Sequence, residues 1–409
     1  MRKYQTVLLF FLSTLVFSQK KNTKVLFVIV DGIPGDVIEK IETPNLDAIS
    51  KIGGYSRAYV GGEKDGYSQT PTVSAVGYNS LLTGVWANKH NVWGNGIKKP
   101  NYNYWTIFRY AQQYKPSLKT AVFSTWLDNR TKLVGEGLAA TGNHKLNYYA
   151  DGFEHDTINF PHGNDRLYIS KIDEHVTDIT SKYIKEKSPD LSWVYLEYTD
   201  DMGHQYGDSE QFYNAIRLMD NQIGRIWNAI VARTKNHHEN WEIYITTDHG
   251  RNASTGKDHG GQTDRERLTW IVTNAKNVNG YFKDKSPAIT DLLPTMLRTL
   301  NIKPKKEQLW EVDGTSIIGK VSVTNAKAVR NNSVLDISWN ALDDKGKVKI
   351  WLSTTNNFSE GKKDTYKRIA KTKIKDEKIS IDISEMPSDF YKIVIEGKHN
   401  TINTWSIKK

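Results

Sequence analysis

Three short apolar runs, each followed by an acidic residue, most constrain how this chain can fold. The runs cover residues 24–30, 193–198 and 241–247, and the acids that follow are Asp31, Asp200 and Asp248. Continuous apolar runs of this length are typical of strands buried in a parallel sheet. Residues 212–230 carry apolar side chains at spacings of three and four, which predicts an amphipathic helix. Alternating strands and helices predict an α/β sandwich with a mainly parallel central sheet flanked by helices.

These acids are expected where such sheets bind ligands, at the carboxyl ends of the strands. Further candidate metal ligands accompany them in four segments: Asp31-Gly32, Asp200-Asp201-Met202-Gly203-His204, Asp248-His249-Gly250 and His259-Gly260-Gly261. Any one of these acids could instead be a helix or turn cap, but their combination favours a site. The chain has no cysteine, so a metal must be held by histidine and carboxylate. Six such ligands suit two divalent ions, with zinc as the first candidate.

A segment rich in hydroxyl groups precedes another expected helix. Thr70, Thr72 and Ser74 lie at or before its start, and the helix is expected to end near Thr83-Gly84. The N-terminus of a helix favours an anion. A serine bound to a metal there loses its proton more easily and becomes a nucleophile. The alternative is that Ser74 only caps the helix.

Together these segments resemble the alkaline phosphatase superfamily and, within it, nucleotide pyrophosphatase/phosphodiesterase-type enzymes. The similarity covers roughly residues 24–318 and includes the stretches 43–47 and 289–295. It implies a nucleophile ten residues before Gly84, which is Ser74, with Thr70 and Thr72 as rivals. It also implies two Zn²⁺ sites. The implied ligands are Asp200, His204 and His259 for the first site, and Asp31, Asp248 and His249, with Ser74, for the second.

Two positions bear on the expected substrate. Asn95 matches an asparagine that, in the diesterase-type enzymes, donates to a nonbridging phosphoryl oxygen. Tyr195 stands where classical alkaline phosphatases place the glutamate of a third, magnesium site. The resemblance therefore implies a di-zinc phosphodiesterase that acts on a small-molecule phosphodiester through a phosphoseryl intermediate. Nucleotides, glycerophosphodiesters and sugar-linked phosphates all remain open as substrates.

Other functions are weighed against this one. A phosphomonoesterase of the same fold is the first alternative, and a phosphonate hydrolase is the second. A non-catalytic envelope-binding protein is an alternative from another class, and it predicts an incomplete set of metal ligands. The zinc content of the protein would discriminate it from the enzymes.

The start of the chain predicts export. Arg2 and Lys3 precede an apolar run at residues 7–17, which is too short to span a bilayer. This pattern is typical of a secretory signal peptide, here residues 1–18. We therefore expect an exported protein, either periplasmic or secreted, with a catalytic domain at residues 19–320.

The last part of the chain has a different texture. Short alternating strands without helical period predict a small all-β sandwich at residues 321–409, which resembles a fibronectin type III-like domain. This part carries 17 basic against 11 acidic residues and most of the net charge of +10. Because residues 19–320 are nearly neutral, we expect no specific nucleic-acid binding; an envelope-surface contact through the basic domain is a possible role. The sequence does not report the oligomeric state.

Overall fold

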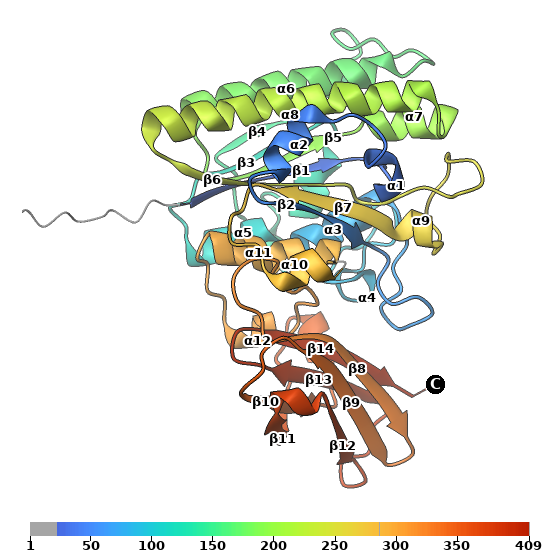
Figure 1. Ribbon diagram of the computed structural model, residues 1–409, viewed down its shortest axis with the longest axis vertical. Coiled ribbons are helices and arrows are strands. Elements are labelled where there is room, and N and C mark those ends of the chain that lie inside the picture. Colours follow the sequence, from blue (N-terminus) through green and yellow to red (C-terminus); the bar gives the residue numbers. More distant parts are fainter. Residues whose placement is uncertain (1–22, 286, 409) are drawn as a thin grey trace, which may run out of the picture.

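The computed structural model describes residues 23–285 and 287–408, so the predicted signal peptide lies outside the described residues. The chain forms an α/β part with a central sheet between helices, followed by two antiparallel sheets (Figure 1). Both agree with the predicted fold class. Across the described ranges, no helix is long and apolar enough to cross a membrane.

The central sheet places the three predicted apolar strands side by side. Its strand order is β2-β7-β6-β1-β5-β3-β4. Strands β6, β1, β5, β3 and β4 run parallel, while β7 pairs antiparallel with both β6 and β2. The bounds are β1 (Thr23–Val30), β2 (Gly54–Tyr59), β3 (Thr120–Ser124), β4 (Tyr148–Ala150), β5 (Leu191–Leu196), β6 (Asn240–Thr246) and β7 (Leu268–Thr273). Because β6, β1 and β5 are neighbours and parallel, their carboxyl ends meet at one edge.

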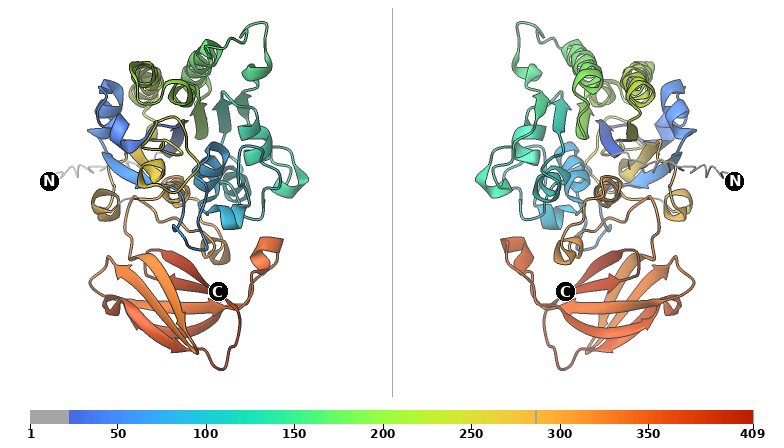
Figure 2. Two further views of the ribbon diagram at one scale, coloured as in Figure 1. Left: turned by 90° about the vertical axis from the view of Figure 1, so that its right-hand side faces the viewer. Right: turned by 90° about the vertical axis from the view of Figure 1, so that its left-hand side faces the viewer.

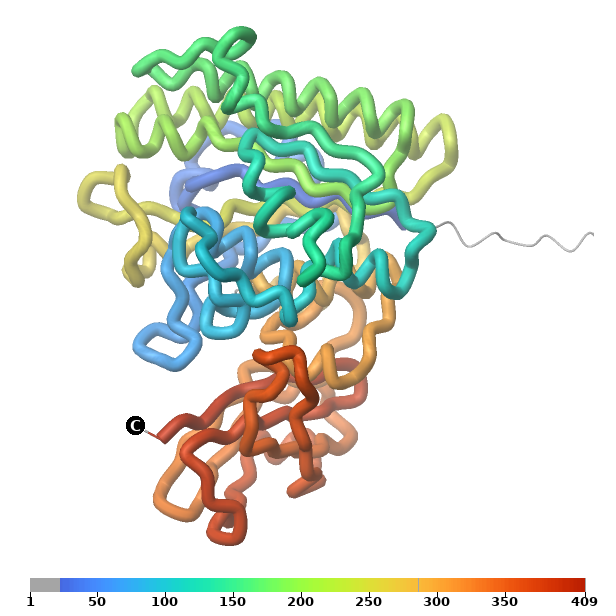
Figure 3. The backbone as a smooth tube through the Cα atoms, turned by 180° about the vertical axis from the view of Figure 1, so that it is seen from behind, coloured from blue at the N-terminus to red at the C-terminus, as the bar shows by residue number. Residues whose placement is uncertain are grey.

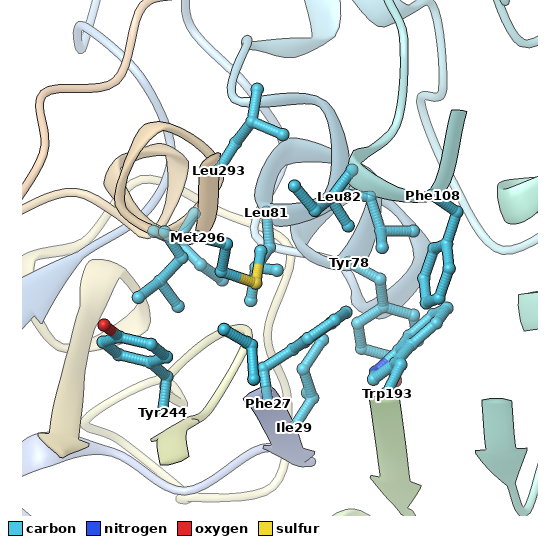
Figure 4. Packing of buried hydrophobic residues seen from close by; sticks show 14 of the residues in the cluster. Phe27, Ile29, Tyr78, Leu81, Leu82, Phe108, Trp193, Tyr244, Leu293 and Met296 are labelled. Atoms are coloured by element: carbon cyan, nitrogen blue, oxygen red, sulfur yellow. The ribbon is translucent and has the colours of Figure 1, made fainter. Parts of the chain in front are cut away.

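Strand β1 shows why this sheet has helices on both faces. Successive side chains of a strand point to opposite faces, and here each face is buried in a different core. Phe27 and Ile29 pack in the same core as Leu81 and Met296 (Figure 4). Val28 belongs to the core on the opposite face, with Ile223. The continuous apolar run of β1 therefore reflects burial on both sides.

The helices form two layers, with α2, α6, α7 and α8 on one face and α3, α5, α10 and α11 on the other (Figure 1). Their bounds are α1 (Gly35–Ile38), α2 (Pro44–Ser50), α3 (Ser74–Thr83), α4 (Ala87–His90), α5 (Ile107–Tyr114), α6 (Leu167–Lys187), α7 (Tyr198–Tyr206), α8 (Glu210–His237), α9 (Asp264–Arg267), α10 (Gly280–Asp284), α11 (Leu292–Thr299) and α12 (Lys306–Leu309). The predicted amphipathic helix at 212–230 lies within α8.

Helix α2 begins at Pro44 after Thr43, but the Thr43 side chain makes no capping hydrogen bond. Instead, the carboxylate of Asp220 in α8 accepts from the N–H groups of Asn45 and Leu46. The cap of this helix therefore comes from a residue distant in sequence.

The C-terminal part is all-β, as predicted. Its sheets have the orders β11-β10-β13-β14 and β12-β9-β8, and buried side chains from both form one core, including Trp339 and Tyr391. The bounds are β8 (Val323–Asn331), β9 (Val334–Ala341), β10 (Lys347–Ser353), β11 (Lys367–Lys373), β12 (Lys378–Asp382), β13 (Phe390–Glu396) and β14 (Thr401–Ile407). The domain boundary at residue 320 and the fibronectin type III-like assignment stay predictions.

Candidate metal centre and active site

The candidate ligands converge at the carboxyl edge of the central strands. Asp31 directly follows β1, and Asp248 and His249 come two and three residues after β6. Strand β5 ends earlier than its apolar run suggests, at Leu196, so Asp200 and His204 lie in helix α7. Their spacing of four residues places both side chains on one face of that helix. The sheet order therefore explains how residues far apart in sequence meet.

One half of the centre is buried. The Nε2 atom of His249 lies 3.3 Å from Asp31 Oδ1 and 3.2 Å from Asp248 Oδ2, and all three side chains are almost fully buried. The Nδ1–H of His249 donates to the carbonyl of Gly250 at 2.9 Å. This bond fixes the ring and leaves the Nε2 lone pair for the centre.

The buried carboxylates fit a cation. Tyr78 and Tyr195 both donate to Asp31 Oδ2, and the N–H of Gly32 donates to Asp248 Oδ1 at 3.1 Å. The remaining oxygens, Asp31 Oδ1 and Asp248 Oδ2, are buried beside His249 Nε2, and no group donates to them when that nitrogen carries its lone pair. Buried charged oxygens of this kind are costly unless they are paired or coordinate a metal.

The other half of the centre is more open. His204 Nε2 lies 3.2 Å from Asp200 Oδ2 and 3.1 Å from His259 Nε2, and the His204 side chain is 45% exposed. The Nδ1–H of His259 donates to the carbonyl of Thr72 at 2.8 Å, which again leaves Nε2 for the centre. These contacts bring together the three ligands implied for the first site.

His249 links the two halves. Ligand atoms of Asp31, Asp248 and His249 lie within 4.8 Å of one another, and so do those of Asp200, His249 and His259. The rings of His249 and His259 stack with their centroids 3.7 Å apart. All six predicted ligands therefore share one site, and their roles as ligands stay predictions.

Charge and burial act differently on the histidines. Burial alone would lower the pKa of His249, but the carboxylates of Asp248 and Asp31 raise it to about 9. Burial lowers the pKa of His259 to about 4, with His249 adding to the effect. Burial and the charge of Asp31 raise the pKa of Asp248 well above its usual value. The buried half therefore concentrates negative charge that attracts cations.

Sequence reasoning missed Arg251, which is fully buried beside the open half. Its guanidinium donates to the carbonyl oxygens of Gly32, Lys257 and Asp200 and to the Asp200 carboxylate. Burial would raise the pKa of Asp200, but the charge of Arg251 holds it well below its usual range. A Cβ on Gly203 would lie only 2.2 Å from Arg251 Cζ. Gly203, next to His204, therefore leaves room for the buried Arg251 side chain. This glycine is the sequence signal that could have indicated a buried side chain at this place.

Ser74 is the hydroxyl residue that faces the centre. It is the first residue of α3, and Val73 precedes it as the cap residue without a side-chain hydrogen bond. Ser74 Oγ lies 3.3 Å from His249 Nε2. The rivals are used elsewhere, since Thr70 Oγ1 donates to the carbonyl of Ser68 and Thr72 Oγ1 to that of Gly261. The geometry thus supports Ser74 as the candidate nucleophile and not as a side-chain cap.

Asn95 reaches the same helix start from an exposed loop. Its Oδ1 accepts from the N–H of Ala75 at 3.0 Å, so the residue lies beside Ser74. With the oxygen engaged, the NH₂ group is the part of the amide that can donate to a substrate oxygen. This arrangement is compatible with the role predicted for Asn95.

A fold and a centre of this kind define the alkaline phosphatase superfamily. The model of the type I phosphodiesterase / nucleotide pyrophosphatase family matches residues 25–291. The chain belongs to this family, and the matched residues cover most of the described α/β part. The predicted family resemblance is confirmed.

Similar proteins agree with this assignment. Ectonucleotide pyrophosphatase/phosphodiesterase family member 5 of Homo sapiens is 22% identical over 82% of this chain and 66% of its own length. Member 7 of Homo sapiens is 24% identical over 58% of this chain and 49% of its length. This chain thus spans less than two thirds of these relatives. A solved 2-O GAG sulfatase has the same fold, with a TM-score of 0.50, 11% identity and coverage of 90% of this chain and 86% of that one.

Proposed function

We propose that the protein is an exported phosphodiesterase that uses two zinc ions and forms a phosphoseryl intermediate on Ser74. The observation that carries this proposal is the position of the Ser74 hydroxyl. It lies 3.3 Å from His249, within a cluster of buried carboxylates and imidazoles. The family membership and the names of the relatives support phosphoric ester hydrolysis as the reaction class.

The six ligands would divide between the two ions as the resemblance implies. Asp31, Asp248 and His249, with Ser74, would hold one ion, and the partly exposed trio Asp200, His204 and His259 would hold the other. The unpartnered oxygens of Asp31 and Asp248 support this division. When bound, the two ions would supply charge stabilisation to the phosphoryl group and lower the pKa of the serine hydroxyl.

The residues of the chain then have defined tasks. Ser74 Oγ attacks the phosphorus, the bond to the first alcohol breaks, and that alcohol leaves with the proton that Ser74 has lost. A phosphodiester between Ser74 and the second alcohol remains. Water then attacks the same phosphorus, which releases the phosphomonoester and returns the proton to Ser74. Asn95 donates from its NH₂ group to a nonbridging oxygen, where negative charge grows in the transition state. The N–H groups in the first turn of α3 add to this stabilisation.

The engagement of Arg251, the cation beside the open half of the site, favours a singly charged substrate. Arg251 is fully engaged by Asp200 and three carbonyl groups, so it is not free to bind a terminal phosphate. A site with an amide donor suits a phosphodiester better than a dianionic monoester. Trp93, 51% exposed and two residues before Asn95, offers an aromatic surface for the group esterified to the phosphate.

The test compares two substrates on the zinc-loaded protein. We expect a higher kcat/KM for bis-p-nitrophenyl phosphate than for p-nitrophenyl phosphate. The reverse order would support the phosphomonoesterase, and no hydrolysis of either would support a non-catalytic protein. The matched control is Ser74→Ala, in which hydrolysis of both esters should disappear.

Export and envelope contact need separate tests. N-terminal sequencing of the protein recovered from outside the cytoplasm should show that residues 1–18 have been removed. An uncleaved N-terminus would contradict the signal-peptide prediction.

An envelope-surface contact through the basic C-terminal domain predicts that the protein cosediments with isolated envelopes. Added salt should release the protein, because salt screens the attraction between charges.

A further inference from the structure

The segment 86–104 carries Asn95 and connects the active site to the C-terminal β domain. Near its middle, Asn95 accepts from the Ala75 N–H beside Ser74. Its two ends contact residues of β14 and of the turn η5 (Asn357–Glu360), both in the β domain. Figure 2 shows this turn, in orange-red, rising from the C-terminal sheets towards the α/β part. The back view in Figure 3 shows the same approach.

The first end is held at Lys89, whose side chain is completely buried. Its Nζ donates to the Glu311 carbonyl at 2.8 Å, to Asp313 Oδ1 at 2.5 Å and to Asn403 Oδ1 at 2.9 Å. A buried ammonium group has three protons and is costly to bury unless each finds an acceptor. The third acceptor comes from Asn403 in β14. The placement of α4 therefore depends on the β domain.

The amide of Asn403 is itself fixed. Its Nδ2 donates to the carbonyl of Val312 at 2.8 Å, so its Oδ1 points to Lys89. The ring of Trp405, two residues further along β14, lies 5.3 Å from Lys89 Nζ. A cation over a buried indole ring adds attraction at the same place.

The other end is held by the turn η5. The side-chain amides of Asn101 and Asn103 donate to the carbonyl of Ser359 at 2.9 Å and 3.0 Å. The adjacent Tyr104 packs on Phe358 with the ring centroids 5.2 Å apart. Both ends of the segment 86–104, which carries Asn95, are thus anchored on the same β domain.

The anchored end is also joined to the nucleophile helix. His90, next to Lys89, is buried and its Nε2 lies 3.0 Å from Ser80 Oγ in α3. A shift of Lys89 would therefore move both the start of the Asn95 loop and its contact with α3. Such a chain of packed, hydrogen-bonded groups can transmit a displacement.

We propose that the C-terminal β domain is a positioning element of the active site. It holds both ends of the segment 86–104 and thereby places the Asn95 amide against the phosphoryl group. Asn403 is the positioning residue that acts through Lys89 and Asn95. This inference rests on the proposed function, because it takes Asn95 as a donor to the substrate. A domain that served only as a spacer would not need to complete the hydrogen bonding of a buried lysine.

The test removes the Asn403 amide from the full-length, zinc-loaded protein. In Asn403→Ala we expect kcat for bis-p-nitrophenyl phosphate to fall about tenfold, with KM changed less than about twofold, because orientation at the reacting centre is lost. In an Asn95→Ala background the same substitution should cause no further loss. The matched control is Lys306→Met, which breaks another interdomain ion pair, with Glu396, away from this segment.

Two kinetic outcomes would overturn the proposal. One is unchanged turnover in Asn403→Ala. The other is an equal loss with and without Asn95, which would indicate a general structural defect. Hydrogen exchange gives a readout that does not need activity. Exchange in residues 91–100 should rise in Asn403→Ala and not in Lys306→Met, and unchanged protection would reject the coupling. If the wild-type protein hydrolyses no ester, the proposed function fails while this exchange experiment still decides the positioning role.

Discussion

The two sides of Ser74 are built in different ways. On the metal side, which comprises the candidate ligands, Asp31 directly follows β1, Asp248 and His249 follow β6 within three residues, and all three are buried. On the substrate side, Asn95 lies on an exposed loop. One end of its segment is held by the Asn403 side chain in β14, and the other end by the backbone carbonyl of Ser359 in η5. The metal side therefore owes its geometry to the sheet, while the substrate side owes it to a few hydrogen bonds. We expect changes to the ligands on the metal side to lower both zinc content and activity, and changes on the substrate side to lower activity with the zinc content unchanged.

The largest effect should come from the residue between the two sides. Ser74→Ala should lower kcat by about a thousandfold or more, because no phosphoseryl intermediate can form. The zinc content should be unchanged, since the carboxylates and imidazoles remain. Ser74→Thr is the matched variant and should keep part of the activity. Steady-state kinetics with elemental analysis checks this, and hydrolysis at the wild-type rate by Ser74→Ala would remove Ser74 from the mechanism.

On the metal side, Asp248→Asn should lose one zinc equivalent and reduce activity by about a hundredfold or more. The amide would replace a buried carboxylate that has an unpartnered oxygen. Elemental analysis of protein purified without chelator measures the loss. Asp208→Asn, which changes an acid paired with Arg265 away from the centre, is the control. Full zinc content in Asp248→Asn would contradict the assignment of Asp248 to the metal side.

On the substrate side, Asn95→Ala should retain both zinc equivalents and lower kcat by about a hundredfold. The loss reflects one missing donor to the charge that grows on the phosphoryl oxygen. Kinetics with bis-p-nitrophenyl phosphate checks the rate. A rise in KM alone, with kcat unchanged, would show that Asn95 binds the substrate and the transition state equally.

A smaller effect on zinc binding is expected from Tyr195, which donates to the candidate ligand Asp31. Tyr195→Phe removes one of the two hydroxyl groups that donate to Asp31 Oδ2. Zinc affinity should fall about tenfold, as measured by competition with a chelator, because the ligand is less firmly oriented. The free energy of unfolding should fall by about 1–2 kcal/mol. If zinc affinity is unchanged, Tyr78 alone orients Asp31.

The smallest expected effect on function comes from pH, which acts on folding stability through His90 on the substrate side. Burial lowers the pKa of His90 to about 3, whereas the unfolded chain has the ordinary value near 6.5. The unfolded state therefore binds more protons between these values, and stability is lost as the pH falls below 6.5. From pH 6.5 to pH 5 the loss should be about 1.6 kcal/mol. In urea unfolding of the metal-free proteins, the loss from pH 6.5 to pH 5 should be larger in the wild type than in His90→Gln by about 1.6 kcal/mol. Equal losses in the two proteins would contradict this.

Much of the fold could be predicted because the signals are local. The apolar runs of β1, β5 and β6 indicate strands that are buried on both faces. The acids that follow these runs in the sequence lie at the carboxyl edge of the sheet. The helix that starts at Ser74 and ends at Thr83 was also predicted.

What could not be predicted depends on tertiary contacts. Arg251 reaches Asp200 only because β6 and β5 flank β1. Tyr195 was recognised only as a missing metal ligand, and its bond to Asp31 depends on the register of β1 and β5. The role of Lys89 could not be foreseen, because its partner Asn403 lies in β14 of the C-terminal sheets, 314 residues away. Local patterns contain no information about such pairs.

The central claim is that two metal ions share one pocket that faces Ser74. The most direct measurement is anomalous diffraction at the zinc absorption edge from crystals of the zinc-loaded protein. The account predicts two peaks in one pocket, one among Asp31, Asp248 and His249 beside the Ser74 hydroxyl, and one among Asp200, His204 and His259. A single peak, or peaks away from these side chains, would contradict it.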